Sequence, residues 1–284
     1  MEYFSVKTIT LAMRSITDLT KVRSFLIEGS KRAALVDTGT GVGHIGEYIR
    51  SLTEKELIVI GTHGHPDHIG GADEFDEVYL SEKDFLLAKE KCGMDSRKDY
   101  AELMFRGKKD IGTESLYFVP ERKRSYSSLI PEMKFDLGGI TVRALPFPGH
   151  TQGMTAILIE EERNVILGDA CNRRVFLFSE EASNVEQYCD TCRSFQNRYR
   201  KFYDRTYMSH GPETLDISLI PNMIETCEDI LAGRDDRIEI EFMGEKAYLA
   251  KDESVPGTRR DGRTGNIAYV NTKIYQGESK GRNN

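Results

Sequence analysis

The first sixty residues alternate short apolar runs with turns of glycine, serine and charged residues. Runs rich in Val, Ile, Phe and Thr between such turns are typical of strands, and we expect strands at Phe4–Met13, Val22–Glu28 and Ala33–Val36. A helix is expected from Ile45 to Leu52. The nearly all-apolar run Glu56–Ile60 predicts a buried strand.

The pattern changes in the stretch from about residue 81 to 133, which is charged and rich in lysine. Its helical part is expected at Glu82–Lys91, and we interpret the stretch as a partly helical insert that could cap a site. Longer helices are expected at Asn184–Phe202 and Leu219–Ala232. Further strands are expected at Glu77–Leu80, Lys134–Leu137, Ile140–Leu145, Met154–Ile159, Asn164–Leu167, Arg205–Met208, Arg237–Phe242, Lys246–Ala250 and Asn266–Ile274.

Strands gather in two halves of the chain, and each half is followed by helices. This order predicts an α/β (α+β) fold in which two sheets pack together with helices outside. We expect residues 1–284 to form one domain, with the insert at about 81–133 and a strand-rich tail at about 236–276.

Composition narrows the range of functions. The 39 basic and 46 acidic residues give a net charge of −7, which disfavours a dedicated nucleic-acid binder. The N-terminus lacks a secretory pattern and no apolar run reaches 18 residues, so we expect no membrane span and a cytoplasmic protein. Five scattered cysteines fit a reducing compartment, and Cys189 and Cys192, inside an expected helix, should only pack in its core. The sequence leaves open whether the protein forms a homo-oligomer.

The segment His63–His68 reads H-G-H-P-D-H and offers four metal ligands within six positions. Alternate side chains of an extended loop point the same way, so His63 and His65 are expected to bind one metal. Asp67 and His68 follow a proline bend and can face a second metal. Neutral imidazoles with carboxylates suit zinc, and they also accept iron or manganese.

Three other candidate ligands each follow an expected strand. His150 comes after Ile140–Leu145, Asp169 after Asn164–Leu167, and His210 after Arg205–Met208. Loops at the ends of strands can converge on one edge of a sheet. We therefore expect these residues to complete one metal site with the histidine loop.

These motifs resemble those of the metallo-β-lactamase-fold hydrolases, from about residue 22 to residue 211. The matching positions are Val36-Asp37-Thr38-Gly39, the H-x-H-x-D-H loop, Gly70-Gly71, Gly149-His150-Thr151, Gly168-Asp169 and Ser209-His210-Gly211. The resemblance implies a four-layer αββα sandwich with the site at one edge of the paired sheets.

The resemblance also implies roles for the individual residues. Two divalent metals would be bound, with zinc as the first expectation and iron or manganese as alternatives. The first metal would be bound by His63, His65 and His150, the second by Asp67, His68 and His210, and both by Asp169. Asp37 would orient the loop through hydrogen bonds. A metal-bridging hydroxide would attack the substrate, because bound cations lower the pKa of water from 15.7 towards about 7, and Asp67 would assist proton transfer.

The same ligand set occurs in several branches of that family. It is similar to that of glyoxalase II-type thioester hydrolases, lactonases, some phosphodiesterases and RNA-processing nucleases. Asp169 replaces the cysteine ligand of some β-lactamases, and His65 replaces the glutamate of flavin-linked diiron oxygen reductases. We expect a hydrolase of a small-molecule thioester, lactone or related ester. The alternatives are a phosphodiesterase or nuclease of the same fold, or a mononuclear-iron oxidoreductase similar to persulfide dioxygenases.

Other polar residues near these motifs have less specific interpretations. Arg173 and Arg174 either bind a carboxylate or phosphate of the substrate, or form a solvated basic pair. Cys171 and Tyr207 are expected in the core. His44 is expected on the surface at the start of a helix.

Overall fold

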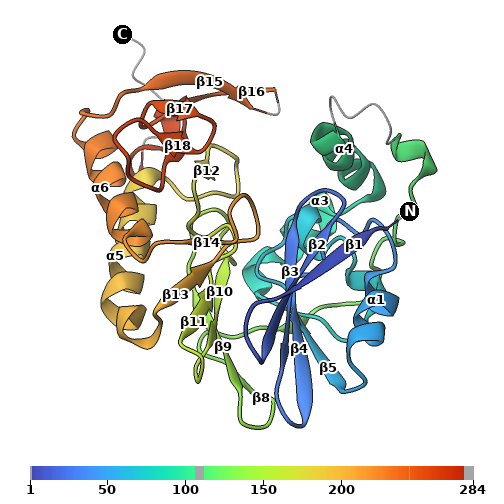
Figure 1. The fold of residues 1–284 in the computed structure, drawn as a ribbon. Coiled ribbons are helices and arrows are strands. Elements are labelled where there is room, and N and C mark those ends of the chain that lie inside the picture. The colour runs from blue at the N-terminus through green and yellow to red at the C-terminus, as the bar shows by residue number, and fades with distance from the viewer. Residues whose placement is uncertain (1, 106–111, 243, 278–284) are drawn as a thin grey trace. The chain divides into compact units, whose positions relative to one another are not determined.

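The computed structural model describes residues 2–105, 112–242 and 244–277 (Figure 1). The chain forms two compact units. The first comprises Met1–Pro146 and Ile157–Glu162, and the second comprises Phe147–Ala156 and Arg163–Asn284. Strand β10 (Thr155–Ile159) begins in the second unit and ends in the first. Within the described ranges, no helix combines the length and the apolar character needed to cross a membrane.

A seven-stranded sheet forms the centre of the first unit, and its strands lie side by side in chain order from β1 to β7. Strands β1 to β4 are antiparallel neighbours, whereas β4 to β7 are parallel. The strands are β1 (Phe4–Thr8), β2 (Met13–Asp18), β3 (Arg23–Glu28), β4 (Arg32–Val36), β5 (Glu56–Ile60), β6 (Tyr79–Leu80) and β7 (Ser127–Ser128). The same unit contains the antiparallel pair of β8 (Lys134–Asp136) and β9 (Thr141–Pro146).

The expectation of a single strand from Phe4 to Met13 is wrong. This segment contains all of β1, a turn, and the first residue of β2. The hydroxyl of Thr10 accepts hydrogen bonds from the N–H groups of Ala12 and Met13 at 3.3 and 3.0 Å, which closes the turn. Leu11 at the turn is fully exposed, so an apolar residue outside the core makes the sequence pattern continuous.

Helix α1 (Ile45–Leu52) provides the crossover between the parallel strands β4 and β5. Its buried residues Ile45 and Ile49 pack against these strands in one apolar cluster. Parallel strands end at the same edge of a sheet, so the loops after β4 and β5 meet. The N–H of Asp37 donates to the Ile60 carbonyl at 2.8 Å, which joins the starts of these two loops.

Short helices occupy the rest of the first unit. They are α2 (Pro66–Ile69), η1 (Ala72–Glu74), η2 (Glu82–Asp84), α3 (Phe85–Lys91), α4 (Met94–Phe105) and η3 (Thr113–Ser115). Ala101 and Phe105 of α4 pack with Leu116 and Phe118 in a separate apolar cluster, which also contains Val42. Residues 106–111 of the expected insert lie outside the described residues.

The second unit contains three groups of strands. Strands β11 (Asn164–Ile166) and β13 (Arg205–Tyr207) are parallel, and β14 (Thr214–Leu215) is antiparallel to β13. A four-stranded sheet follows the order β12 (Val175–Leu177), β19 (Ile267–Tyr269), β16 (Glu245–Leu249) and β15 (Ile238–Phe242). Strands β17 (Glu253–Val255) and β18 (Thr258–Arg259) form a small antiparallel pair.

Two helices pack together in the second unit, α5 (Val185–Tyr199) and α6 (Leu219–Leu231), and η4 (Arg200–Phe202) continues α5. Helix α5 begins with a capping box formed by Asn184 and Gln187. Cys189 and Cys192 are buried on α5 as free thiols. Both cysteines thus lie on the expected helix and in its buried face, as predicted.

The expected strand Asn266–Ile274 is shorter in the structure. Strand β19 ends at Tyr269, and η5 (Asn271–Lys273) follows it. The ammonium group of Lys273 donates to the carbonyls of Glu180 and Ala182 at 3.2 and 2.6 Å. These bonds hold the chain in a turn where the sequence pattern favours a strand.

Candidate metal centre

A buried carboxylate, Asp37, organises the histidine loop of the first unit. Its Oδ1 accepts the backbone N–H of Thr62 at 2.7 Å, and its Oδ2 accepts the Thr62 hydroxyl at 2.9 Å and Nδ1 of His68 at 2.8 Å. Asp37 has a φ of 63°, in the left-handed region where aspartate is enriched. These bonds support the expected role of Asp37 in orienting the loop.

The same bonds determine which ring nitrogens carry protons. Thr62 has one hydroxyl proton, which it donates to Asp37, so its oxygen must accept Nδ1–H of His63 at 3.1 Å. Nδ1 of His68 likewise donates to the Asp37 carboxylate. In both rings the proton is on Nδ1, and Nε2 carries the lone pair that can bind a metal.

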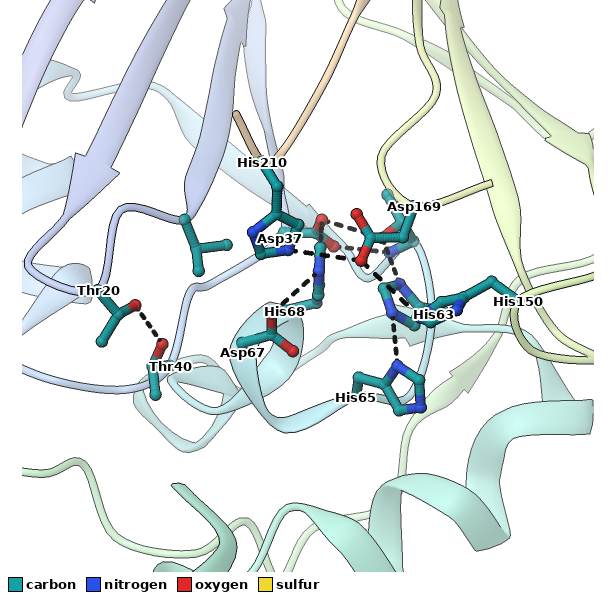
Figure 2. A network of polar contacts seen from close by, with 12 residues as sticks. Thr20, Asp37, Thr40, His63, His65, Asp67, His68, His150, Asp169 and His210 are labelled. Atoms are coloured by element: carbon teal, nitrogen blue, oxygen red, sulfur yellow. Dashed lines mark hydrogen bonds and ion pairs between the residues drawn. The ribbon is translucent and has the colours of Figure 1, made fainter. Parts of the chain in front are cut away.

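His65 and Asp67 lie beside these two rings. Nε2 of His63 and Nδ1 of His65 are 3.1 Å apart. Two nitrogen ligands of a tetrahedral zinc ion would be separated by about 3.3 Å, so these nitrogens suit one shared ion. Oδ2 of Asp67 lies 3.5 Å from Nε2 of His68 (Figure 2). The first unit therefore brings together His63, His65, Asp67 and His68.

The second unit brings together the other three expected ligands. Asp169 follows β11 and His210 follows β13, and these parallel strands end at the same edge. Oδ2 of Asp169 lies 3.4 Å from Nε2 of His210 and 3.8 Å from Nε2 of His150. Nδ1 of His150 donates to the Phe176 carbonyl at 3.2 Å, so Nε2 of this ring also carries the lone pair. Asn172 donates to Oδ1 of Asp169 at 3.3 Å and steadies that carboxylate.

The donor chemistry of both clusters fits divalent metal ions. Imidazoles held with an unprotonated nitrogen towards carboxylates are ligands that zinc, iron and manganese accept. A thiolate ligand is not part of either set. Burial raises the pKa of Cys171 to about 12, so this cysteine remains a thiol in the core, as expected.

The loop after β4 makes further polar contacts that the sequence did not predict. The N–H and hydroxyl of Thr38 both donate to the His68 carbonyl, at 2.6 and 3.2 Å. The hydroxyls of Thr20 and Thr40 are 2.7 Å apart (Figure 2). Both residues also bond to the buried carboxylate of Asp18. Burial raises the pKa of Asp18. The run of polar residues directly after the buried strand β4 was the signal in the sequence that could have predicted these contacts.

The other polar residues that the sequence singled out lie in different surroundings. His44 is exposed at the N-cap of α1, and Tyr207 is buried, as expected. Arg174 forms an ion pair with Glu253. Nε of Arg173 and Nε of Arg174 are both buried without a hydrogen-bond partner in the part of the chain that the structure describes. Binding of a substrate anion by either arginine stays a prediction.

A family model adds an independent comparison of the sequence. The model of the metallo-beta-lactamase superfamily matches residues 17–181, which is more than half of the 284-residue chain. The chain belongs to the metallo-beta-lactamase superfamily. The matched range contains every expected ligand from His63 to Asp169, and His210 follows it.

Curated relatives are similar at low identity. The Beta-lactamase-like protein 2 homolog of Caenorhabditis elegans is 26% identical over 219 residues, which cover 74% of this chain and 61% of that protein. An atrochrysone carboxyl ACP thioesterase of Passalora fulva is 22% identical over 209 residues, which cover 70% of this chain and 52% of that protein. The chain thus spans between half and two thirds of the length of these relatives.

Solved structures of the superfamily share the fold. A metallo-beta-lactamase from Pontibacter korlensis superposes with a TM-score of 0.57 at 18% identity, covering 80% of this chain and 99% of that one. The mixed α/β composition of the chain agrees with this match. The fold class predicted from the sequence, α/β of the metallo-β-lactamase type, is confirmed.

Proposed function

We propose that this member of the superfamily is a dinuclear metal-dependent hydrolase that cleaves a thioester, lactone or related ester. The observation that carries the proposal is the hydrogen-bond network around Asp37. It keeps the protons of His63 and His68 on Nδ1 and aims the ligating nitrogen of each ring away from the carboxylate. Metal binding requires such control over the protonation of two buried imidazoles, whereas an ordinary hydrophobic core does not.

The proposed ligand groups combine residues from both clusters. One metal would be held by His63, His65 and His150, the other by Asp67, His68 and His210, and Asp169 would bind both. In the second unit a single oxygen of Asp169 lies near the Nε2 atoms of both His150 and His210, as a shared ligand requires. Zinc is the first expectation for the metal, and iron and manganese accept the same donors.

The chemistry divides between the metals and the protein. Bound divalent cations would supply a nucleophile at neutral pH, by lowering the pKa of water from 15.7 to about 7, and would polarise the substrate oxygen. Asp67 is buried beside His68, and we propose that its carboxylate also accepts and returns protons during the reaction. Asp37 keeps His68 in the ligating tautomer throughout.

A thioester or ester substrate is supported by the ligand set and by a relative. The similar protein of Passalora fulva is named an atrochrysone carboxyl ACP thioesterase. The histidine at position 65 favours hydrolysis over redox chemistry, and the aspartate at position 169 belongs to a donor set similar to that of thioester hydrolases, lactonases and some phosphodiesterases. A reducing compartment is supported by the five cysteines, which are all free thiols.

The proposal is tested by metal analysis and a substrate panel. Protein purified without chelators should contain about two metals per chain, and it should hydrolyse at least one thioester or lactone. Asp67→Ala should abolish that activity, whereas Asp76→Ala, at a 99% exposed carboxylate of the same unit, should not change it. One iron per chain with oxygen consumption on a persulfide, or hydrolysis of phosphodiesters alone, would replace this proposal with one of its alternatives. Activity that survives Asp67→Ala would end the proposed mechanism.

A further inference from the structure

Arg97 of helix α4 is fully buried, although arginine is seldom buried unless it is paired with an acid. No carboxylate among the described residues forms an ion pair with it, and its Nε has no hydrogen-bond partner there. Nη2 reaches only the sulfur of Met94, at 3.9 Å. The one strong bond of the guanidinium runs from Nη1 to the Gly70 carbonyl at 2.9 Å.

Burying a guanidinium with so few bonds is unfavourable, because the group loses its hydration without full replacement. Burial accordingly lowers the pKa of Arg97. The contact that can offset this cost is the single strong bond to Gly70. Gly70 is the C-cap residue of α2, the four-residue helix that carries Asp67 and His68.

The surroundings of this bond leave no space for a larger residue. A Cβ atom on Gly41 would lie 2.7 Å from Nη1 of Arg97 and 2.5 Å from the Gly70 carbonyl oxygen. Gly41 also has a φ of 78°, in the region that favours glycine. Glycine at position 41 is therefore required for Arg97 to reach the end of α2.

The other end of the histidine loop is held from the same segment of the chain. Gly64 lies between His63 and His65, and both of its backbone polar groups are bonded. Its N–H donates to Oδ2 of Asp84 at 2.9 Å, and its carbonyl accepts the thiol of Cys92 at 3.3 Å. A Cβ on Gly64 would lie 2.9 Å from the backbone oxygen of Asp84, so the two segments approach as closely as glycine permits.

We propose that the segment Asp84–Arg97 is a clamp on the metal-binding loop, in which Asp84 and Arg97 are positioning residues that increase the affinity of the loop for metal. This inference rests on the proposed function. The clamp fixes the backbone at Gly64 and Gly70, on either side of α2. It gives the insert a role in the site that does not require it to touch the substrate.

The test separates metal affinity from stability. The dissociation constant of the apo-protein for Zn²⁺ is measured by competition with a chromogenic chelator, and the unfolding of the apo-protein is measured in urea. Arg97→Met replaces the buried charge with an apolar chain. We expect the dissociation constant to rise about 10–100-fold, as for other residues that orient metal ligands. The apo-protein should unfold at the same or a higher urea concentration, because a poorly compensated buried charge has been removed.

Matched variants make the result specific. Asp84→Ala should also weaken Zn²⁺ binding, whereas Asp84→Asn should bind like the wild type, because its amide oxygen can still accept the Gly64 N–H. The control for Arg97 is Arg122, which donates to the carbonyls of Ala72 and Phe75 at 2.8 and 2.7 Å, beyond the histidine loop. Arg122→Met should lower stability and leave the dissociation constant unchanged.

Unchanged Zn²⁺ binding in both Arg97→Met and Asp84→Ala would overturn the clamp. An equal loss of affinity in Arg122→Met would also overturn it, because general destabilisation would then explain the effect. If Arg97→Met does not fold, the comparison of Asp84→Ala with Asp84→Asn decides the question. A wild-type protein that binds no metal would refute the proposed function itself, whereas failure of the clamp alone leaves wild-type binding intact.

Discussion

Replacing Asp37 with asparagine should change the protonation of two histidine rings with little change in shape. Asparagine also tolerates the left-handed φ of 63°, but it has one acceptor oxygen in place of two. The backbone N–H of Thr62, 2.7 Å from Oδ1, cannot reverse its direction, so the amide oxygen should take that position. The amide NH₂ group then takes the Oδ2 position, where it faces the Thr62 hydroxyl and Nδ1 of His68.

This new donor should reverse both hydrogen-bond chains. Nδ1 of His68 must become an acceptor, which moves the ring proton to Nε2. The Thr62 hydroxyl must accept from the amide and turn its own proton towards Nδ1 of His63, so that ring also becomes protonated on Nε2. Restoring each ligating tautomer breaks one hydrogen bond, worth about 1–1.5 kcal/mol. Metal binding should weaken by about 2–3 kcal/mol, which is about 30–150-fold at 1.4 kcal/mol per tenfold.

Zn²⁺ competition gives the dissociation constant, and nitrogen-15 NMR of the imidazoles in the apo-protein reports the tautomers directly. The control is Asp76→Asn, the same substitution at an exposed carboxylate, which should change neither measurement. A folded Asp37→Asn protein that binds Zn²⁺ as tightly as the wild type would refute the reasoning. So would NMR signals that leave the ring protons on Nδ1.

Three further predictions concern other parts of the chain. Asp169→Asn should weaken Zn²⁺ binding about tenfold or more, whereas Cys171→Ala should not change it; equal effects on the dissociation constant would contradict the ligand assignment. Zn²⁺ at about 100 times its dissociation constant should add about 2.7 kcal/mol to the unfolding free energy, or about 5–10 °C in Tm, and a chelator should remove this gain; a Tm that does not respond argues against binding to the folded state. A hydrogen bond from Lys251, at 2.7 Å, lowers the pKa of Asp229 below its ordinary value of 3.8. The ionised carboxylate therefore stabilises the folded protein above pH 3.8, and this stabilisation is lost as the pH falls through the lowered pKa. Asp229→Asn should therefore destabilise the apo-protein by about 0.5–1 kcal/mol at pH 7, with a difference that shrinks in acid; a difference independent of pH in urea titrations would show that the ion pair is not its cause.

The sequence predicted best what depends on local patterns. The apolar run Glu56–Ile60 has the bounds of β5, because a strand buried by its neighbours needs apolar residues at successive positions. The ligands of the first unit lie within six residues, and those of the second follow strands, so their positions could be inferred without knowing which strands pair. The site-residue assignment across both units stays a proposal.

The hydrophobic pattern predicted strands that are too long where a single polar contact determines the local conformation. Thr10 closes a turn inside an apolar stretch, and Lys273 binds carbonyls more than ninety residues earlier in the chain. Neither contact changes the hydrophobic periodicity, so each segment resembles a longer strand. Thr62 was missed for a related reason, because a threonine between a strand and a histidine has no distinctive pattern.

The histidine loop shows why the ligand motif is not sufficient by itself. Helix α2 has only four residues, and an isolated helix of that length is unstable because nucleation is unfavourable. The loop therefore takes its shape from Asp37 on one side and from Arg97 and Asp84 on the other. Arg97 binds a backbone carbonyl 27 residues away, and a carbonyl has no signature in a sequence. In the sequence, such support is marked by the glycines at the points of contact, Gly41 and Gly64. Their role is recognised from the structure, because a Cβ atom at either position would collide with the neighbouring segment.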